Sequence, residues 1–235
     1  MCCRYLLLHE HLKQLLEKLG LKPSAEFLSR YNITPGVSLP SVRKAPRHPQ
    51  LEVTTLHWGL IPTWAKSNAT PLVNARAESL SEKPSFRDAF ARRRCVLPAS
   101  GFFEWEAIGR TRKPWLFRRR DEAPFFLAGL WEPSIAGSQT EEPTFAVVTT
   151  EPNELMRPVH HRQPLVLNEK AAATWLDSDM DMARLNLLLN PFAAEDFAAD
   201  AVSRRVSNVR NDDPECLLPS TEADGDEMPQ LSLEF

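Results

Sequence analysis

Seven short β-rich runs between Leu51 and Leu167 constrain the fold of this chain most strongly. Each run combines aromatic and β-branched residues, and prolines or charged turns separate one run from the next. This spacing predicts an antiparallel sheet or a barrel. In chain order the runs are VTTLHW, CVLPA, FFEWE, PWLF, PFFLAGLW, TFAVVTT and PLVL.

Helical patterns lie on either side of these runs. Leucines recur at helical spacing from Leu8 to Leu19, and Gly20 follows as a candidate helix end. Asn168 is a suitable N-cap for a helix that reaches Trp175.

The C-terminal third adds two further expected elements. A second helical stretch is expected to end near Asn190, and a last strand is expected over AVSRRVSNV, residues 201–209. The sequence therefore predicts an α+β fold, with an open barrel-like antiparallel sheet and flanking helices.

Length and composition exclude several classes of protein. At 235 residues, 43% of them hydrophobic, the chain can bury a substantial core as one unit. No apolar run approaches the ~20 residues that cross a bilayer, and none matches the ~7–15-residue core of a signal peptide. Four cysteines without paired spacing indicate free thiols in a reducing compartment. We expect an intracellular, cytoplasmic monomer with no membrane partner, no metal and no cofactor.

Charge is distributed unevenly along the chain. Eight acidic residues and no Lys or Arg lie from Asp212 onward. Removing these eight from the 31 acidic residues leaves 23 against 28 Lys and Arg, so residues 1–211 are mildly basic, as a phosphate-binding surface requires. Residues 220–235 have the composition of an acidic, disordered tail, and residues 1–219 are expected to form the folded domain.

Cys2 stands directly behind Met1 and supplies the most specific chemistry. Removal of Met1 leaves a free α-amine beside a thiol. The amine can condense with an aldehyde to an imine, and the thiol can close on the imine carbon to give a thiazolidine. Taken alone, a cysteine at position two is more often accidental.

Six further segments accompany MCCR in a fixed order, and together they resemble the SRAP family, the SOS-response-associated peptidase domain proteins. The resemblance implies a compact α+β fold with the mature N-terminus beside a positively charged DNA groove. It also implies that the protein shields abasic sites in single-stranded DNA by a covalent crosslink. The segments are YNITPG, WGLIPTWAKS, NARAES, GFFEWE, VHHRQP and VSNVRNDDPECLLP, the last resembling the family's C-terminal strand and loop.

The resemblance assigns four catalytic residues. Cys2 matches the crosslinking nucleophile, and Asn74 matches the amide that orients the N-terminal residue and the sugar. Glu104 matches the acidic residue of proton transfer, and His160 matches the histidine of an HDRMP-like motif. Opening the sugar, losing water and closing the ring each move a proton, so an acid/base pair beside the amine is required.

DNA contacts are assigned to cationic and aromatic side chains. Arginines are suited to phosphates, and tryptophans are suited to base stacking or to a wedge, although a tryptophan is more often part of the core. These residues are Arg4, Arg76, Arg162, Trp58, Trp64 and Trp105.

Each assignment has an ordinary structural alternative. Asn74 can cap a turn, Glu104 can be a solvent-facing carboxylate paired with an arginine, and either histidine of the His160–His161 pair can be a loop residue. Arg76 can form an ion pair of little consequence with Glu78. Only the ordered set of motifs favours the functional interpretation.

The chain departs from the family pattern at three positions. Cys3 replaces a glycine, which places a second thiol where it can compete with Cys2 or crowd the DNA. His161 and Gln163 replace an aspartate and a methionine, so the acid that could fix the tautomer of His160 is absent.

We therefore expect a DNA-damage protein that binds abasic single-stranded DNA near the nucleoid and forms a thiazolidine through Cys2. The family is also described as autopeptidases, and the same chemistry allows a lyase activity. Whether the chain removes its own Met1 stays open. Two alternatives remain, an N-terminal-nucleophile hydrolase and a noncovalent single-strand binder.

Overall fold

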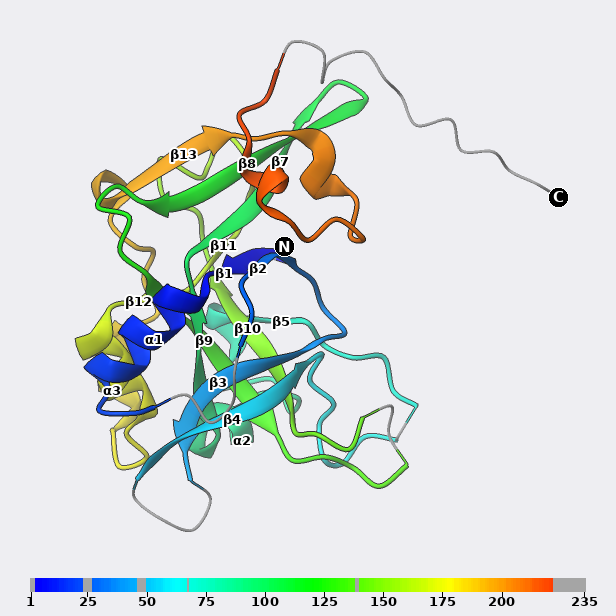
Figure 1. Ribbon diagram of the computed structural model, residues 1–235. Helices are drawn as coiled ribbons and strands as arrows, with labels where there is room; N and C mark the ends of the chain where they lie inside the picture. Colours follow the sequence, from blue (N-terminus) through cyan, green and yellow to red (C-terminus); the bar gives the residue numbers. More distant parts are fainter. Residues whose placement is uncertain (1–2, 23–26, 46–49, 67, 138–139, 222–235) are drawn as a thin grey trace, which may run out of the picture.

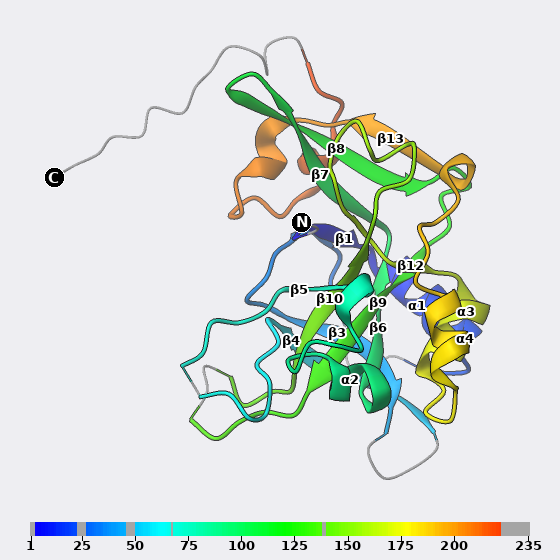
Figure 2. The same ribbon diagram turned by 180° about the vertical axis from the view of Figure 1, so that it is seen from behind.

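The computed structural model describes residues 3–22, 27–45, 50–66, 68–137 and 140–221. Its strands form two sheets, with helices packed against the second of them (Figures 1 and 2). The first sheet contains, in spatial order, β13 (Phe197–Ala201), β8 (Thr111–Arg119), β7 (Gly101–Ile108), β1 (Tyr5–Leu7) and β2 (Arg30–Ile33).

The second sheet is larger and strongly curved. β10 pairs with β9 as well as with β4, so part of this sheet closes on itself without forming a regular barrel. Its strands, in spatial order, are β11 (Gln163–Pro164), β10 (Thr144–Thr150), β4 (Leu51–Trp58), β3 (Ser38–Lys44), β6 (Arg94–Ala99), β9 (Phe125–Glu132) and β12 (Val166–Leu167), with β5 (Asn74–Arg76) beside β10.

The α+β class and all seven β-rich runs are confirmed. The pairing is not antiparallel throughout, because β10 runs parallel to both β4 and β5. The loop between β4 and β5, residues 59–73, returns the chain so that β5 begins alongside β10 in the same direction. This parallel register brings Asn74 beside Val147 in the middle of the fold.

The expected helices are present. α1 (His9–Lys18) ends before Gly20, which adopts a φ of +71° that an L side chain rarely takes. α3 (Glu169–Leu176) begins with Oδ1 of Asn168 accepting a hydrogen bond from the amide of Ala171 at 2.9 Å.

Shorter helical elements complete the described part of the chain. α4 (Met182–Leu187) ends close to the expected position near Asn190. The remaining elements are α2 (Arg87–Arg92) and the 3₁₀ turns η1 (Ala77–Ser79), η2 (Ala194–Asp196), η3 (Arg204–Ser207) and η4 (Pro214–Leu217).

The last strand expected over residues 201–209 is wrong. The strand lies earlier, at β13, and the expected segment instead contains η3. Val202 and Val206 are both buried, but a spacing of four places two residues on one face of a helical turn and of a strand alike, so their burial pattern does not separate the two structures. Ser203 caps this turn by accepting a hydrogen bond from the amide of Arg205. The segment likened to the family's C-terminal strand is therefore a pair of turns, η3 and η4.

Two apolar clusters lie on opposite faces of the first sheet. The main core fills the space between the sheets and includes Tyr5 and Phe102, which are cross-strand partners. The smaller cluster packs Leu6 and Phe103 against η3 and η4. β1 therefore passes between the two clusters, and Figure 1 shows it between the layer of β7, β8 and β13 and the layer of β3, β4 and β10.

None of the helices within the described residues is both long enough and apolar enough to cross a membrane. The acidic tail predicted over residues 220–235 lies outside the described residues from position 222 onward.

Candidate functional site

The predicted nucleophile Cys2 lies outside the described residues, but its neighbour Cys3 is described. The backbone carbonyl of Arg4 accepts a hydrogen bond from the amide of Phe103 at 2.9 Å, which fixes the chain just before β1. Adjacent Cα atoms are about 3.8 Å apart across a trans peptide. The surroundings of Cys3 are therefore described in its place.

Asn74 contacts Cys3 directly. Its Nδ2 donates a hydrogen bond to Sγ of Cys3 at 3.4 Å. Its Oδ1 is buried and accepts no hydrogen bond from any described residue. Asn74 does not cap a turn: it is the first residue of β5, so the parallel ladder with β10 positions it.

Glu104 supplies the second unpaired buried acceptor. It lies on β7 opposite Trp115 of β8 and is only 3% exposed, so it is not a solvent-facing carboxylate. Among the described residues none donates a hydrogen bond to its Oε1. Burial raises the pKa of Glu104 to about 7, and the positive charge of Arg112 opposes this shift. The side chain can therefore hold or release a proton near neutral pH.

His160 is the histidine that approaches Glu104. Its Nδ1 lies 3.9 Å from Oε1 of Glu104, and also 3.0 Å from the carbonyl oxygen and 3.1 Å from the amide nitrogen of Arg162. Burial lowers the pKa of His160, which favours the neutral ring. The ring of His161 packs against that of His160 at 4.3 Å between centroids, and His161 itself is exposed.

The chain thus brings three predicted side chains, Asn74, Glu104 and His160, to one place from separate elements. Two buried oxygen acceptors, one of them on a carboxyl group that titrates near neutral pH, suit an amine that must lose and gain protons. In the residues that the structure describes, no group of three or more His, Cys, Asp or Glu side chains could hold a metal ion.

Arg76 and Arg162 line a polar cleft of about 590 Å³ beside this cluster. Arg162 is largely buried and donates two hydrogen bonds to Glu78, at 2.7 and 2.9 Å, and one to the carbonyl of Thr149 at 2.6 Å. Burial of Glu78 tends to raise its pKa, but the hydrogen bonds from Arg162 outweigh this effect, so the pKa of Glu78 is lowered. Glu78 is thus hydrogen-bonded to Arg162, whereas the alternative considered from the sequence was an ion pair between Glu78 and Arg76.

Arg4 is committed to the protein rather than free at the surface. Its Nη1 donates to Oδ1 of Asn32 and to the carbonyl of Val206, each at 2.7 Å. Its guanidinium carbon lies 5.1 Å from the centroid of a Trp105 ring, and Nε1 of Trp105 donates to Oγ of Ser207 at 2.9 Å. Arg4 and Trp105 together fix the first sheet to η3.

Asn32 and Asp212 are structural partners of the site that sequence reasoning did not single out. Nδ2 of Asn32 donates to three carbonyls, those of Val206, Asn208 and Asn211, at 2.6–3.1 Å. The carboxylate of Asp212 accepts from the amide of Asn32, from the amide of Tyr31 and from the side chain of Arg30. The only sequence signal was their place within YNITPG and VSNVRNDDPECLLP.

The two remaining tryptophans differ in exposure. Trp58 is 1% exposed, stacks on Phe145 and donates from Nε1 to the carbonyl of Val73, so it belongs to the core. Trp64 is 66% exposed and lies in the loop that follows β4. Only Trp64 presents most of its ring to solvent, as base stacking requires.

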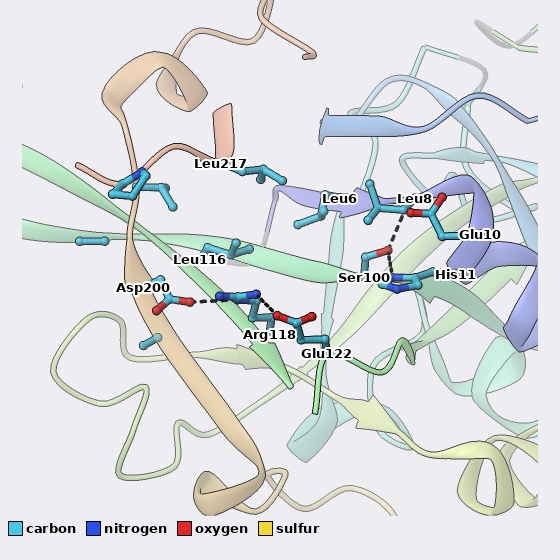
Figure 3. A pocket seen from close by; sticks show the side chains of 14 residues that line it. Leu6, Leu8, Glu10, His11, Ser100, Leu116, Arg118, Glu122, Asp200 and Leu217 are labelled. Atoms are coloured by element: carbon cyan, nitrogen blue, oxygen red, sulfur yellow. Dashed lines mark hydrogen bonds and ion pairs between the residues drawn. The ribbon is translucent and has the colours of Figure 1, made fainter. Parts of the chain in front are cut away.

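A hollow of about 650 Å³ lies on the other face of the first sheet, where Leu6 and Leu116 form part of its floor. Figure 3 shows Arg118 between Asp200 and Glu122, to which it donates hydrogen bonds at 3.0 Å each. Its positive charge is already balanced by two carboxylates. None of the side chains predicted for the site lines this hollow.

Comparison with known proteins places the chain in a family. The family profile described as SOS response associated peptidase (SRAP) matches residues 1–209. The abasic site processing protein YoqW of Bacillus subtilis is 34% identical over 224 residues, which cover 92% of this chain and 99% of that protein. YedK of Escherichia coli, also named an abasic site processing protein, is 29% identical over 197 residues, covering 83% of this chain and 86% of that one.

Solved structures agree with the sequence comparison. A protein from Bacteroides thetaiotaomicron superposes with a TM-score of 0.81 at 25% identity, covering 94% of this chain and all of that one. The resemblance first seen in the ordered motifs therefore extends over nearly the whole chain. From the profile match, the full-length relatives and the shared fold, we conclude that this chain belongs to the SRAP family.

Proposed function

We propose that the chain processes abasic sites in DNA by forming a covalent thiazolidine through Cys2 after removal of Met1. The names of its relatives support the substrate, since YoqW and YedK are both called abasic site processing proteins. The observation that carries the chemistry is the pair of buried, unpaired acceptors beside Cys3, Oδ1 of Asn74 and Oε1 of Glu104.

An α-amine at residue 2 is the donor that these acceptors lack. An ammonium group has three N–H donors and a neutral amine has two, and residue 2 is tethered one peptide bond away from Cys3. A buried polar atom without a partner costs roughly 1–3 kcal/mol. Binding the amine between Asn74 and Glu104 removes this cost and holds the nucleophile in place.

The reaction joins one aldehyde carbon to two atoms of Cys2. The amine nitrogen adds to the carbon of the ring-opened sugar to give a carbinolamine, whose hydroxyl leaves as water once it is protonated. The thiol sulfur then adds to the resulting imine carbon, and the thiol proton passes to the nitrogen. One water is lost in all.

We assign these proton transfers to Glu104 and His160. A carboxyl group with a pKa of about 7 is protonated often enough to donate to the leaving hydroxyl and ionised often enough to accept from the amine. His160 lies beside it as a neutral ring that can take the proton onward.

DNA binding is assigned to the cationic cleft and to the exposed ring of Trp64. Arg76, Lys83 and Arg162 line the cleft, and phosphate contacts dominate the affinity of such surfaces. Trp64 offers a stacking surface. Arg4 and Trp105 instead hold η3 on the first sheet through Val206 and Ser207, and Trp58 belongs to the core.

The test is an adduct assay with purified protein and an oligonucleotide that carries one abasic site. We expect a heat-stable 1:1 adduct, a protein mass that lacks Met1, and no adduct with a tetrahydrofuran analogue that has no aldehyde. Cys2→Ala should bind the analogue normally and give no heat-stable adduct. An undiminished adduct from Cys2→Ala would refute the proposal.

The same samples separate the two alternatives. Retention of the oligonucleotide that disappears with salt, without any adduct, would indicate a noncovalent single-strand binder. Turnover of an amide substrate without an adduct would indicate an N-terminal-nucleophile hydrolase. Mass analysis after expression with and without a methionine aminopeptidase tests whether the chain removes its own Met1.

A further inference from the structure

We propose that Cys3 is a positioning residue that orients the Asn74 amide for capture of the aldehyde by Cys2. The inference rests on the proposed function and adds a role to the residue at which this chain departs from the glycine of the family pattern. It replaces the expectation from sequence that a second thiol competes with Cys2 or crowds the DNA.

The geometry supplies the first argument. The Asn74 side chain has two ends, and Sγ of Cys3 accepts a hydrogen bond from one of them, Nδ2, at 3.4 Å. The other end, Oδ1, stays buried and without a donor among the described residues. An asparagine amide can turn end for end, which would present N–H groups where the incoming amine needs an acceptor. The contact with Cys3 restricts that rotation.

Glu104 supplies an independent argument. Its side chain is only 5% exposed, no described residue donates a hydrogen bond to its Oε1, and its charge acts on the Cys3 thiol. The thiol therefore lies beside both acceptors that the proposed function requires. Among the described residues, Cys3 accepts the hydrogen bond of the Asn74 side chain, while the ladder between β5 and β10 holds the Asn74 backbone.

The chemistry of the thiol fits positioning better than attack. Burial raises the pKa of Cys3, against a smaller lowering by the hydrogen bond from Asn74, so the thiol stays protonated at neutral pH. The nitrogen of Cys3 is part of a peptide bond and cannot close a thiazolidine ring. Cys3 can thus lie beside the reacting carbon without diverting it into a stable product.

The experiment compares Cys3→Ala and Cys3→Ser, alone and combined with Asn74→Ala. The measured quantities are the single-turnover crosslinking rate at saturating abasic single-stranded DNA and the Kd for the tetrahydrofuran analogue. Only protein whose mass lacks Met1 is compared, because position three could affect its removal. Cys3 is half-buried and precedes β1, so these variants should fold.

We expect Cys3→Ala to slow crosslinking about three- to tenfold, the range that corresponds to one neutral hydrogen bond, with an unchanged Kd. Cys3→Ser is the matched control, since its hydroxyl can also accept from Nδ2, and it should stay within about twofold of the unchanged protein. In the Asn74→Ala background, Cys3→Ala should change the rate less than twofold, because the two residues act through one contact.

Two results would overturn the inference. One is a Cys3→Ala rate equal to that of the unchanged protein, and the other is an equal slowing in the Asn74→Ala background. If Asn74→Ala is too slow to measure, the comparison of Cys3→Ser with Cys3→Ala decides alone. An unchanged protein that forms no adduct at all would instead refute the proposed function.

Discussion

Oε1 of Glu104 lies 3.9 Å from Nδ1 of His160, and burial moves the pKa values of the two groups in opposite directions. The pKa of the carboxyl group rises to about 7, while that of the imidazole falls below its ordinary value. Near neutral pH the pair therefore contains a carboxyl group that is partly protonated beside a neutral ring. Such a pair can exchange a proton with a bound group, and the ionised carboxylate is then a buried charge beside a neutral ring.

This pair predicts the pH dependence of crosslinking. If protonated Glu104 donates to the leaving hydroxyl, the rate falls as the pH rises through about 7, the pKa of that carboxyl group. Glu104→Gln should lower the rate about 100-fold and remove this limb of the profile, while DNA affinity stays the same. Rates measured from pH 5.5 to 9 for both proteins test the assignment, and a persistent limb near pH 7 in Glu104→Gln would contradict it.

The raised pKa of Glu104 also predicts how the stability of the folded protein depends on pH. Because its pKa is raised in the folded protein, the folded state binds the proton more tightly than the unfolded state does, and stability falls as the pH rises from about 4.5 to 7. Glu104→Gln cannot ionise, so it should be more stable than the unchanged protein above pH 7, by about 3 kcal/mol, and nearly equal below pH 4.5. Urea unfolding at pH 4 and pH 8 measures the difference. Equal stabilities at pH 8 would show that the ionised carboxylate is well solvated.

Glu78 predicts a change in DNA affinity. Its carboxylate accepts one hydrogen bond from each terminal nitrogen of Arg162. A phosphate would otherwise be able to accept from these two donors. Glu78→Gln should tighten binding of single-stranded DNA several-fold and steepen its salt dependence. Glu151→Gln is the matched control, since it removes the same charge from the same cleft without releasing Arg162. Fluorescence anisotropy at several salt concentrations separates the two, and equal tightening by both variants would point to net charge alone.

Asp212 predicts a loss of both stability and rate. Its carboxylate accepts three hydrogen bonds from β2 and so holds residues 206–212 against Asn32 and Arg4. Asp212→Asn should lower the free energy of unfolding by roughly 1–3 kcal/mol and slow crosslinking. Asp213→Asn is the neighbouring control, because Asp213 pairs with Arg205 at the surface and should matter little. Thermal unfolding and the kinetics of adduct formation are measured for both variants. A similar loss of stability and rate in Asp213→Asn would contradict the role of Asp212.

The acidic C-terminal residues predict a different outcome. Truncation after Ser220 removes five acidic residues and leaves the hydrogen bond from the amide of Ser220 to the carbonyl of Ala201. Adduct yield should be unchanged, and DNA binding should tighten most at low salt if the tail competes with DNA for the basic body. Loss of the adduct would show that residues beyond Ser220 belong to the folded domain.

Local patterns were enough to predict most elements of the fold. The seven β-rich runs, α1 and the Asn168 cap depend on neighbouring residues, so the sequence alone contains their signal. The parallel pairing of β10 with β4 and β5 depends on how distant strands meet, and no local pattern encodes it. The strand expected over residues 201–209 was wrong because the chain turns at η3, where Ser203 caps the turn and Val206 packs into the same cluster as Val202.

The site was less predictable than the fold. Motif order was enough to nominate Asn74, Glu104 and His160, and the structure brings these three together. Residue type alone could not separate a core tryptophan such as Trp58 from an exposed one such as Trp64. Nor could it reveal that Glu78 would pair with Arg162, since that contact joins η1 to a loop 84 positions away.

The bond between Arg4 and Val206 joins positions 202 apart, and this separation has a consequence for the timing of assembly. A ribosome makes Arg4 and β1 first. It makes the segment around Val206, which holds Arg4, among the last parts of the chain. At ~5–20 residues per second, roughly 10–40 s pass between the two. If Cys2 captures an aldehyde as proposed, its aminothiol would be made before the site is finished, and selective capture would begin only when synthesis of this segment is complete.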